Sequence, residues 1–249
     1  AAGAAAGRGV PPRLIGTTAF AFAPHASAAY LEAACLVEVP ADLAAFPAEA
    51  AFLPAAETAI SIVHDAHPRL GEKIGVFGGG VIGLLVAAGL ASLGLAVHVF
   101  EPNPKRRELA IAVGAQLAAP PEDAPACDFD VSIECSGSPR ALQAAVDATR
   151  DHGSVVLASW YGRKPVGLQL GTRFHRSHLR LLVSQVSEIP PGVAGTWTKA
   201  RRFSAAWDLI RRVRPAALLV SATLPLERAA EAYGGLDRGE EFVCHLSYG

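Results

Sequence analysis

The segment KIGVFGGGVIGLLVAAGLASLGLAVHVFE, residues 73–101, decides the fold of this chain. It opens with a short apolar run, residues 73–77, which is typical of a buried parallel strand. The glycine-rich run GGGVIG, residues 78–83, then opens an apolar stretch that predicts a helix. A second apolar run, residues 96–100, predicts the next strand, and Glu101 ends it. The segment is therefore a complete strand–helix–strand unit of about thirty residues.

Hydropathy alone gives the same region a different interpretation, because residues 74–100 contain no Lys, Arg, Asp or Glu. An apolar stretch of that length is a candidate membrane span. It contains seven glycines, however, and three of them are consecutive. Each glycine costs a continuous helix up to about 1 kcal/mol relative to alanine. The glycines therefore favour the strand–turn–helix interpretation, and we expect no membrane span.

The run 78–83 fits the pattern G-x-G-x-x-G, and an acidic residue follows at a strand end. Gly78 permits a tight turn, Gly80 leaves room for a pyrophosphate, and Gly83 lets the helix pack closely on the sheet. The start of the helix adds N–H groups and positive potential. We therefore expect a dinucleotide here. The predicted pyrophosphate-binding residues are Gly78, Gly80, Val81, Ile82 and Gly83.

Glu101 predicts which dinucleotide is bound. A carboxylate at this strand end can accept hydrogen bonds from both hydroxyls of the adenine ribose, and it repels a 2′-phosphate. NAD is therefore expected in preference to NADP. The basic run Lys105-Arg106-Arg107 weakens that preference because one of these residues, Arg106 above all, could pair with a phosphate.

Strand and helix patterns continue to alternate downstream, in the order expected of a doubly wound parallel sheet, the Rossmann architecture of the α/β class. The segments 129–134, 154–158 and 179–185 predict three further strands. Ligands of such sheets bind beyond the carboxyl ends of the strands. We therefore expect Ser136, Ser159 and Trp160 near the nicotinamide or its ribose.

Composition excludes several classes of function. The 249 residues carry a net charge of −1, so nothing indicates nucleic-acid binding. The four cysteines are far apart and form no CxxC pair, so we expect neither a cysteine zinc cluster nor a disulfide scaffold.

Charge is unevenly distributed, because residues 163–214 hold eleven basic residues and two acidic ones. Two interpretations stay open: a surface complemented by the acidic remainder of the chain, or a site for an anionic substrate or acidic partner. Within this segment, residues 197–214 predict an amphipathic helix with Trp197, Ala200, Ser204, Trp207 and Ile210 on one stripe. Arg202 is expected away from that stripe.

Longer motifs resemble a known family. The runs 71–94, IECSGSP (133–139) and HGSVVLASWYG (152–162), with the closing run 224–249, resemble the medium-chain alcohol dehydrogenases. The runs FAPH (22–25), AETAI (56–60), FHRSHLRLLVSQVS (174–187) and GTWTKARR (195–202) resemble the branch that includes bacteriochlorophyllide hydroxyethyl dehydrogenases. This resemblance implies a two-domain NAD-dependent oxidoreductase that interconverts a secondary alcohol and a ketone.

The resemblance also implies a zinc-holding GroES-like catalytic domain, and the chain departs from it there. Fewer than eighty residues precede Gly78, and they contain no early Cys with a Gly-His-Glu segment. We therefore expect a shortened catalytic lobe and no catalytic zinc, although Glu57 lies near the place where some members offer a carboxylate ligand. Tyr161, His175 and His178 are alternative acids, with His25 and His64 as more remote ones, and none is assigned as catalytic.

These observations predict three regions: a remnant of the catalytic domain (1–58), a dinucleotide-binding domain (59–185) and a C-terminal return to the catalytic domain (186–249). The low-complexity start, residues 1–13, is expected to be flexible. The expected substrate is a small alcohol or ketone, with a homodimer or a larger assembly as the form of the protein. We expect an intracellular protein of the cytoplasm or an organelle matrix. The alternative function is a catalytically degenerate, dehydrogenase-like accessory subunit.

Overall fold

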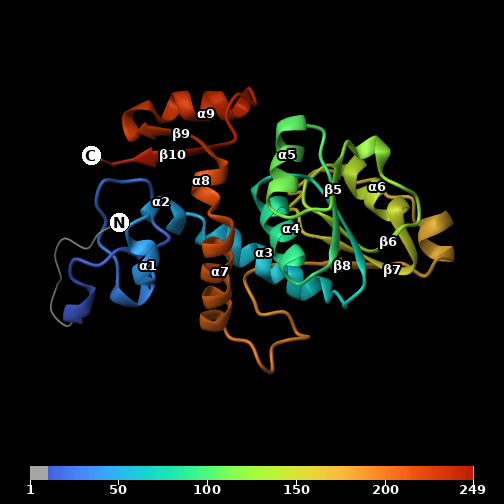
Figure 1. Cartoon of the computed structure of the whole chain (residues 1–249), viewed down its shortest axis with the longest axis horizontal. Coiled ribbons are helices and arrows are strands. Elements are labelled where there is room, and N and C mark those ends of the chain that lie inside the picture. Colours follow the sequence, from blue (N-terminus) through green and yellow to red (C-terminus); the bar gives the residue numbers. More distant parts are fainter. Residues whose placement is uncertain (1–10, 249) are drawn as a thin grey trace. The chain divides into compact units, whose positions relative to one another are not determined.

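The computed structural model describes residues 11–248, so most of the predicted flexible start lies outside the described residues. The chain divides into two compact units (Figure 1). One unit comprises Ala1–Leu53 with Ile210–Gly249, and the other comprises Pro54–Leu209. Each unit is described by itself.

The central unit alternates helices and strands along the chain. Its helices are α3 (Leu53–Ala66), α4 (Val81–Ser92), α5 (Pro104–Ala112), α6 (Pro139–Ala148) and α7 (Lys199–Val213). Its strands are β3 (Lys73–Phe77), β4 (Ala96–Phe100), β5 (Leu117–Ala119), β6 (Phe129–Glu134), β7 (Thr149–Leu157) and β8 (Arg180–Val183). Short helical turns cover Pro121–Asp123 and Leu170–Phe174.

The six strands form one parallel sheet in the order β5-β4-β3-β6-β7-β8. The chain adds strands on both sides of β3: β4 and β5 follow on one side, and β6, β7 and β8 follow on the other. Because strand–helix–strand crossovers are right-handed, this reversal of direction at β3 places α4 and α5 on one face of the sheet and α6 on the other. Figure 1 shows these three helices around the sheet. The fold is the doubly wound α/β architecture that the sequence predicts, and the point of reversal is where such sheets bind ligands.

Helix α4 is the most deeply enclosed element. Its residues from Gly83 to Leu90 are all buried. Each of them is glycine or an aliphatic residue, so this part of the helix has no polar face to expose. The other face carries an aromatic core in which Phe77 and Phe100 stack with ring centroids 4.9 Å apart and Phe129 meets Phe100 at 5.6 Å. Residues of α6 complete this core. The sheet that carries the glycine turn is therefore packed on both faces.

The other unit contains short elements. They are β1 (Ala19–Phe20), β2 (Val37–Glu38), α1 (Ala41–Ala44), α2 (Pro47–Ala50), α8 (Pro215–Leu219), β9 (Val220–Pro225), α9 (Ala229–Asp237) and β10 (Val243–Ser247). Three-residue helical turns cover Pro12–Leu14, Ala33–Cys35 and Leu226–Arg228. Strands β1 and β2 pair antiparallel, and β9 and β10 pair parallel. Asp42 and Glu49 in this unit accept hydrogen bonds from Arg211 and Arg214 at 2.7 and 3.1 Å.

No helix among residues 11–248 is long and apolar enough to cross a membrane. The apolar region 74–100 is instead divided into β3, the glycine turn, α4 and β4, as the glycines predict.

The predicted stripe of helix α7 is wrong in part. Ala200 and Ser204 are exposed, whereas Arg202 is among the most buried side chains, at 1% exposure. The reason is tertiary: buried partners hold its guanidinium, as described below, and the pattern of apolar residues contains no information about them.

Candidate functional site

The glycine turn joins β3 to α4 at the carboxyl edge of the sheet. Gly78 adopts a φ of +111°, and its N–H donates to the carbonyl oxygen of Phe100 at 2.8 Å. A Cβ at Gly83 would lie 1.9 Å from the carbonyl oxygen of Gly78, so helix and turn touch in a way that only glycine permits. A Cβ at Gly80, by contrast, would meet no heavy atom within 4 Å. The space over Gly80 is open, as the approach of a pyrophosphate requires.

The first turn of α4 presents backbone N–H groups at the same edge. Gly80 is the N-cap and has no side chain that could bind these groups. The Leu84 N–H donates to the Gly80 carbonyl oxygen at 2.9 Å, which begins the backbone ladder of the helix. The N–H groups of Val81, Ile82 and Gly83 precede that bond, and no acidic residue lies in the first turn. This helix start therefore suits an anion.

Glu101 lies against the glycine turn, as its spacing predicts. Its side chain is buried, with Oε2 accepting from the Gly79 N–H at 2.7 Å and Oε1 accepting from the Asn103 N–H at 2.9 Å. A Cβ at Gly79 would lie 2.9 Å from Cγ of Glu101, so the carboxylate and the turn are in close contact. Arg106 lies in the first turn of α5, and its N–H donates to Asn103 Oδ1 at 3.3 Å. The structure brings the predicted ribose residue, Glu101, to the glycine turn, and it places Arg106 at the start of the helix that follows.

A second buried carboxylate, which sequence reasoning missed, lies on the other side of the turn. Glu134 ends β6 and is fully buried. Its Oε1 accepts three hydrogen bonds: from the Ser136 N–H and Oγ–H, both at 2.6 Å, and from the Gly137 N–H at 2.9 Å. The signal for it is the run Glu134-Cys-Ser-Gly, in which a strand-end acid is followed by a hydroxyl and small residues that expose their N–H groups.

Ser136 and Ser159 share this hydrogen-bond network. Ser159 Oγ accepts from the Gly137 N–H at 2.9 Å and donates to the carbonyl oxygen of Glu134 at 3.4 Å. A Cβ at Gly78 would lie 2.9 Å from Cβ of Ser136, so the network adjoins the glycine turn. The two predicted serines therefore lie together at the carboxyl ends of β6 and β7.

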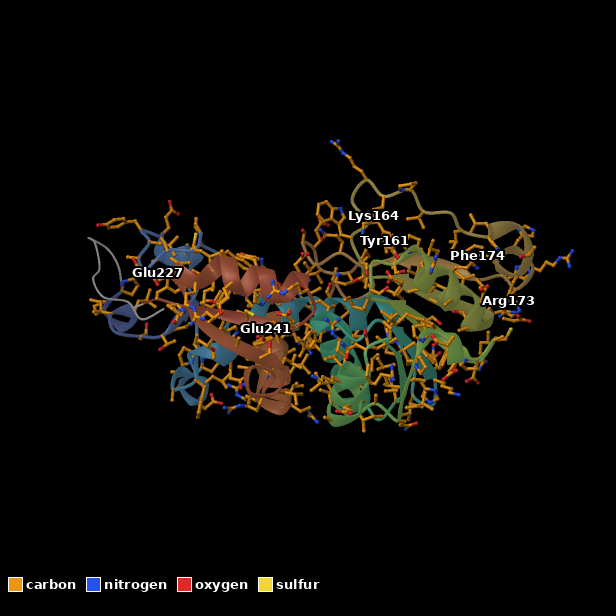
Figure 2. The ribbon with its side chains drawn as sticks, turned by 90° about the horizontal axis from the view of Figure 1, so that it is seen from above. Tyr161, Lys164, Arg173, Phe174, Glu227 and Glu241 are labelled. Atoms are coloured by element: carbon orange, nitrogen blue, oxygen red, sulfur yellow. The ribbon has the colours of Figure 1, made fainter. Side chains whose placement is uncertain are left out.

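Two titratable neighbours respond to the Glu134 charge. Burial and, after it, the Glu134 carboxylate raise the pKa of the Cys135 thiol. Burial, then the Glu134 charge and a hydrogen-bond interaction with the Glu134 side chain, raise the pKa of Tyr161, whose hydroxyl also donates to the carbonyl oxygen of Ser138 at 3.1 Å. Figure 2 shows Tyr161 near Lys164, and the Lys164 N–H donates to the Tyr161 carbonyl oxygen at 3.1 Å. In this arrangement Tyr161 joins the loop after β7 to the start of α6 and holds its proton.

The histidine candidates lie elsewhere. His178 precedes β8 and stacks on His152 of β7 with ring centroids 5.3 Å apart. Both are at the amino end of their strands, whereas the glycine turn is at the carboxyl end. His175 is exposed, and His25 shares a hydrogen bond of 2.5 Å with Tyr248. Burial lowers the pKa of His64, which packs on Trp197. The structure brings none of these imidazoles to the Glu101–Glu134 edge.

Glu57 is engaged in an ion pair. Its Oε1 accepts from Arg202 Nε at 3.0 Å and from Nη2 at 2.7 Å, and both side chains are buried. Arg202 also donates to the carbonyl oxygens of Val186 and Glu188 at 2.7 and 2.8 Å. The pair therefore ties α3 to the segment that follows β8.

Part of the basic segment is neutralised within the chain. Four of its basic residues form ion pairs with acidic residues outside the segment: Arg173 with Asp151, Arg202 with Glu57, Arg211 with Asp42 and Arg214 with Glu49. These four support the interpretation of a basic segment complemented by the acidic remainder.

Comparison with known proteins agrees with this geometry. Residues 81–204 match the family model described as zinc-binding dehydrogenase. Residues 81–204 are thus similar to the zinc-binding (medium-chain) alcohol dehydrogenase family. The 2-dehydro-3-deoxy-L-galactonate 5-dehydrogenase of Pseudoalteromonas atlantica is 30% identical over 182 residues, which cover 68% of this chain and 49% of the relative. Human sorbitol dehydrogenase is 30% identical over 187 residues, covering 68% and 48%.

Among solved structures, the L-idonate 5-dehydrogenase of Escherichia coli has the same dehydrogenase fold, with a TM-score of 0.73 at 23% identity. The match covers 88% of this chain and 61% of that one. The chain spans about half the length of the two sequence relatives named above.

The family description implies zinc, and the residues of this chain that the structure describes do not fit it. Within residues 11–248, no group of three or more His, Cys, Asp or Glu side chains is arranged to hold a metal ion. Glu57, the carboxylate that the sequence resemblance offers as a candidate ligand, is held by Arg202. We therefore derive no step through zinc.

Proposed function

We propose that this chain binds NAD(H) at the glycine turn and serves a dehydrogenase that interconverts a secondary alcohol and a ketone by hydride transfer, without a catalytic zinc held by the described residues. The observation that carries the proposal is the open space over Gly80, bordered by the first turn of α4 and by Glu101. We assign residues 59–185 as the coenzyme-binding domain, within the compact unit 54–209.

Each assigned residue has a distinct task. The N–H groups of Val81, Ile82 and Gly83 bind the pyrophosphate, and Gly78 and Gly80 let it approach the backbone. Glu101 accepts from the adenine ribose hydroxyls, while Arg106 lies at the side where a phosphate would extend. Ser136 and Ser159 lie toward the nicotinamide half. The bound coenzyme supplies the hydride acceptor or donor, and these residues orient it and disfavour a 2′-phosphate.

The substrate class is proposed from the relatives. The two sequence relatives are named as dehydrogenases of a deoxygalactonate derivative and of sorbitol, both hydroxyl-rich molecules. We propose a small polyhydroxylated alcohol or its ketone as substrate. The resemblance to bacteriochlorophyllide hydroxyethyl dehydrogenases proposes a different secondary alcohol, so turnover should be measured with both kinds of substrate.

A second candidate, a degenerate accessory subunit, is favoured by one observation. Glu57 is occupied by Arg202, and the described residues hold no metal-binding group. Nucleotide binding without NAD-linked oxidation of either kind of substrate would support this candidate over the enzyme.

Titration calorimetry with NADH and NADPH tests the binding proposal. NADH is expected to bind more tightly; uptake of neither nucleotide would overturn the binding, and tighter NADPH binding would overturn the preference. Gly80→Ala sharpens the test, because Gly80 has a φ of −72° and open space around a Cβ. The variant should fold normally and bind NADH at least about tenfold more weakly, since the methyl group fills the pyrophosphate space. Gly195→Ala, also in open space, is the matched control.

A further inference from the structure

The Glu134 carboxylate is buried and, among the described residues, has no cation paired with it, as buried charges normally have. Three donors meet at Oε1, whereas Oε2 is buried and forms no complete hydrogen bond, and the Tyr161 hydroxyl lies close enough to interact with the carboxylate. Donors from three groups stabilise the negative charge of a carboxylate. Within residues 11–248 Glu134 forms no ion pair, unlike Glu57 with Arg202. A buried charge that lacks a paired cation is destabilising. A cation from outside the described residues would therefore stabilise the Glu134 carboxylate.

The charge reaches its surroundings. It contributes to raising the pKa values of Cys135 and Tyr161, since each would have to add a second negative charge nearby. The Glu134 charge therefore acts on Cys135 and Tyr161 at the carboxyl edge of the sheet, where burial lowers the dielectric constant.

The position within the fold identifies the cation. Glu134 is paired with Phe77, the last residue before the glycine turn, and the next N–H, of Cys135, donates to the Phe77 carbonyl oxygen at 2.8 Å. The adenine ribose belongs to the β4 side, where Glu101 lies, so the nicotinamide half extends to the β6 and β7 side. The nicotinamide ring is a cation in the oxidised coenzyme and neutral in the reduced one.

We propose that the Glu134 carboxylate makes this site favour the oxidised, cationic nicotinamide ring over the reduced, neutral ring. The inference rests on the proposed function, because it requires a nicotinamide coenzyme at the glycine turn. Oε1 keeps its three donors throughout, and the charge acts on the ring through the low-dielectric interior. Glu134 is thus a positioning residue for the turn 136–138 and, by its charge, a determinant of coenzyme redox preference.

The experiment compares dissociation constants of NAD⁺ and NADH for the wild-type chain and for Glu134→Gln. Glutamine keeps the shape of the side chain and an acceptor oxygen while removing the charge. The ratio of NAD⁺ to NADH affinity should fall about tenfold, the scale expected for one charge acting through a protein interior. Asp147→Asn removes an exposed carboxylate from α6, accepts the same hydrogen bond from Gln143, and should leave the ratio unchanged. Equal weakening of both coenzymes, or an unchanged ratio, overturns the proposal.

A second measurement needs no variant and applies even if Glu134→Gln does not fold. ADP-ribose has the same pyrophosphate and no nicotinamide ring. The wild-type chain should gain several-fold in affinity from ADP-ribose to NAD⁺, and less from ADP-ribose to NADH; the opposite order overturns the proposal. If no nucleotide binds, the proposed function fails and this inference fails with it. If both coenzymes bind and charge removal leaves the ratio intact, only this inference fails.

Discussion

A buried glutamate lies at the carboxyl end of β4 and another at the carboxyl end of β6, and the two carboxylates differ in how their oxygens are hydrogen-bonded. Glu101, at the end of β4, is buried, and each of its oxygens accepts a backbone N–H. Glu134, at the end of β6, is also buried, but all its donors meet at one oxygen and the other has none. The two carboxylates lie on opposite sides of the glycine turn, Glu101 through Gly79 and Glu134 through the Ser136 turn that adjoins Gly78.

The difference separates two tasks. A carboxylate with both oxygens held is fixed in place, which suits hydrogen bonding to ribose hydroxyls and discrimination against a phosphate. A buried carboxylate whose hydrogen bonds meet at one oxygen and which has no paired cation still exerts the field of its charge, and such positions concentrate at functional sites. Glu57 provides a third case, in which a cation of the same chain completes the compensation.

The most severe way to break the comparison is to disrupt the turn that lies between the two carboxylates. Gly83→Ala places a methyl group 1.9 Å from the Gly78 carbonyl oxygen, so the glycine turn must shift. We expect that shift to disturb its contacts with Glu101 and with Ser136. We expect a loss of more than about 3 kcal/mol in the free energy of unfolding, measured by denaturant titration. Gly89→Ala in the same helix, where the nearest atom would be Val63 Cγ2 at 3.6 Å, should unfold at the wild-type concentration or higher. Equal behaviour of the two variants would contradict the close contact.

The value of a cation for a buried carboxylate can be measured at Glu57. Arg202→Met removes the guanidinium and leaves Glu57 buried without its cation, so the free energy of unfolding should fall by about 3 kcal/mol. The double variant Glu57→Gln with Arg202→Met should recover part of that loss, because no uncompensated charge remains. A double variant as unstable as Arg202→Met alone would show that the charge of Glu57 is not what destabilises the single variant.

The sequence predicts most of the central unit because local patterns decide it. The predicted bounds of β3, β4 and β6 agree with the structure, since apolar residues dominate β3 and β4, alternate with polar ones along β6, and turn residues border all three. Strand β5, Leu117–Ala119, was missed because three residues at a sheet edge carry no pattern of their own. Strand β7 begins at Thr149, earlier than predicted, and its first residues are polar.

The candidate site divides in the same way. Glu101 could be predicted because a fixed spacing links it to the glycine turn. The burial of Glu134 depends on the turn at Ser136, which hydrogen-bonds to the Glu134 carboxylate and contacts Gly78. A pattern of apolar residues cannot predict these contacts. Arg202 was expected on an exposed face because its partner, Glu57, lies 145 residues away in the sequence. Pairings of that kind arise only from the tertiary fold.

The preference for NADH over NADPH tests the proposed role of Glu101, the carboxylate with both oxygens hydrogen-bonded. Glu101→Gln keeps one acceptor oxygen for Gly79 or Asn103 and removes the charge that repels a 2′-phosphate. The ratio of NADPH to NADH affinity should rise about tenfold, measured by calorimetric titration. Glu108→Gln, an exposed carboxylate on α5, is the control for net charge and should leave the ratio near its wild-type value. A ratio that does not respond to Glu101→Gln would remove Glu101 from coenzyme selection.

The smallest effect is expected within β4, upstream of Glu101. Burial, followed by the charge of Lys73, lowers the pKa of His98 below its ordinary value of 6.5. The unfolded chain therefore binds a proton at this histidine at a higher pH than the folded chain does, and stability falls as the pH drops below 6.5. His98→Asn should reduce the loss of unfolding free energy between pH 7 and pH 5, by less than about 1 kcal/mol because the ring is only half-buried. Denaturant titrations at the two pH values measure this slope, with exposed His175→Asn as control. If the slope is the same in the wild-type chain and in His98→Asn, titration at β4 does not contribute to the acid sensitivity of the fold.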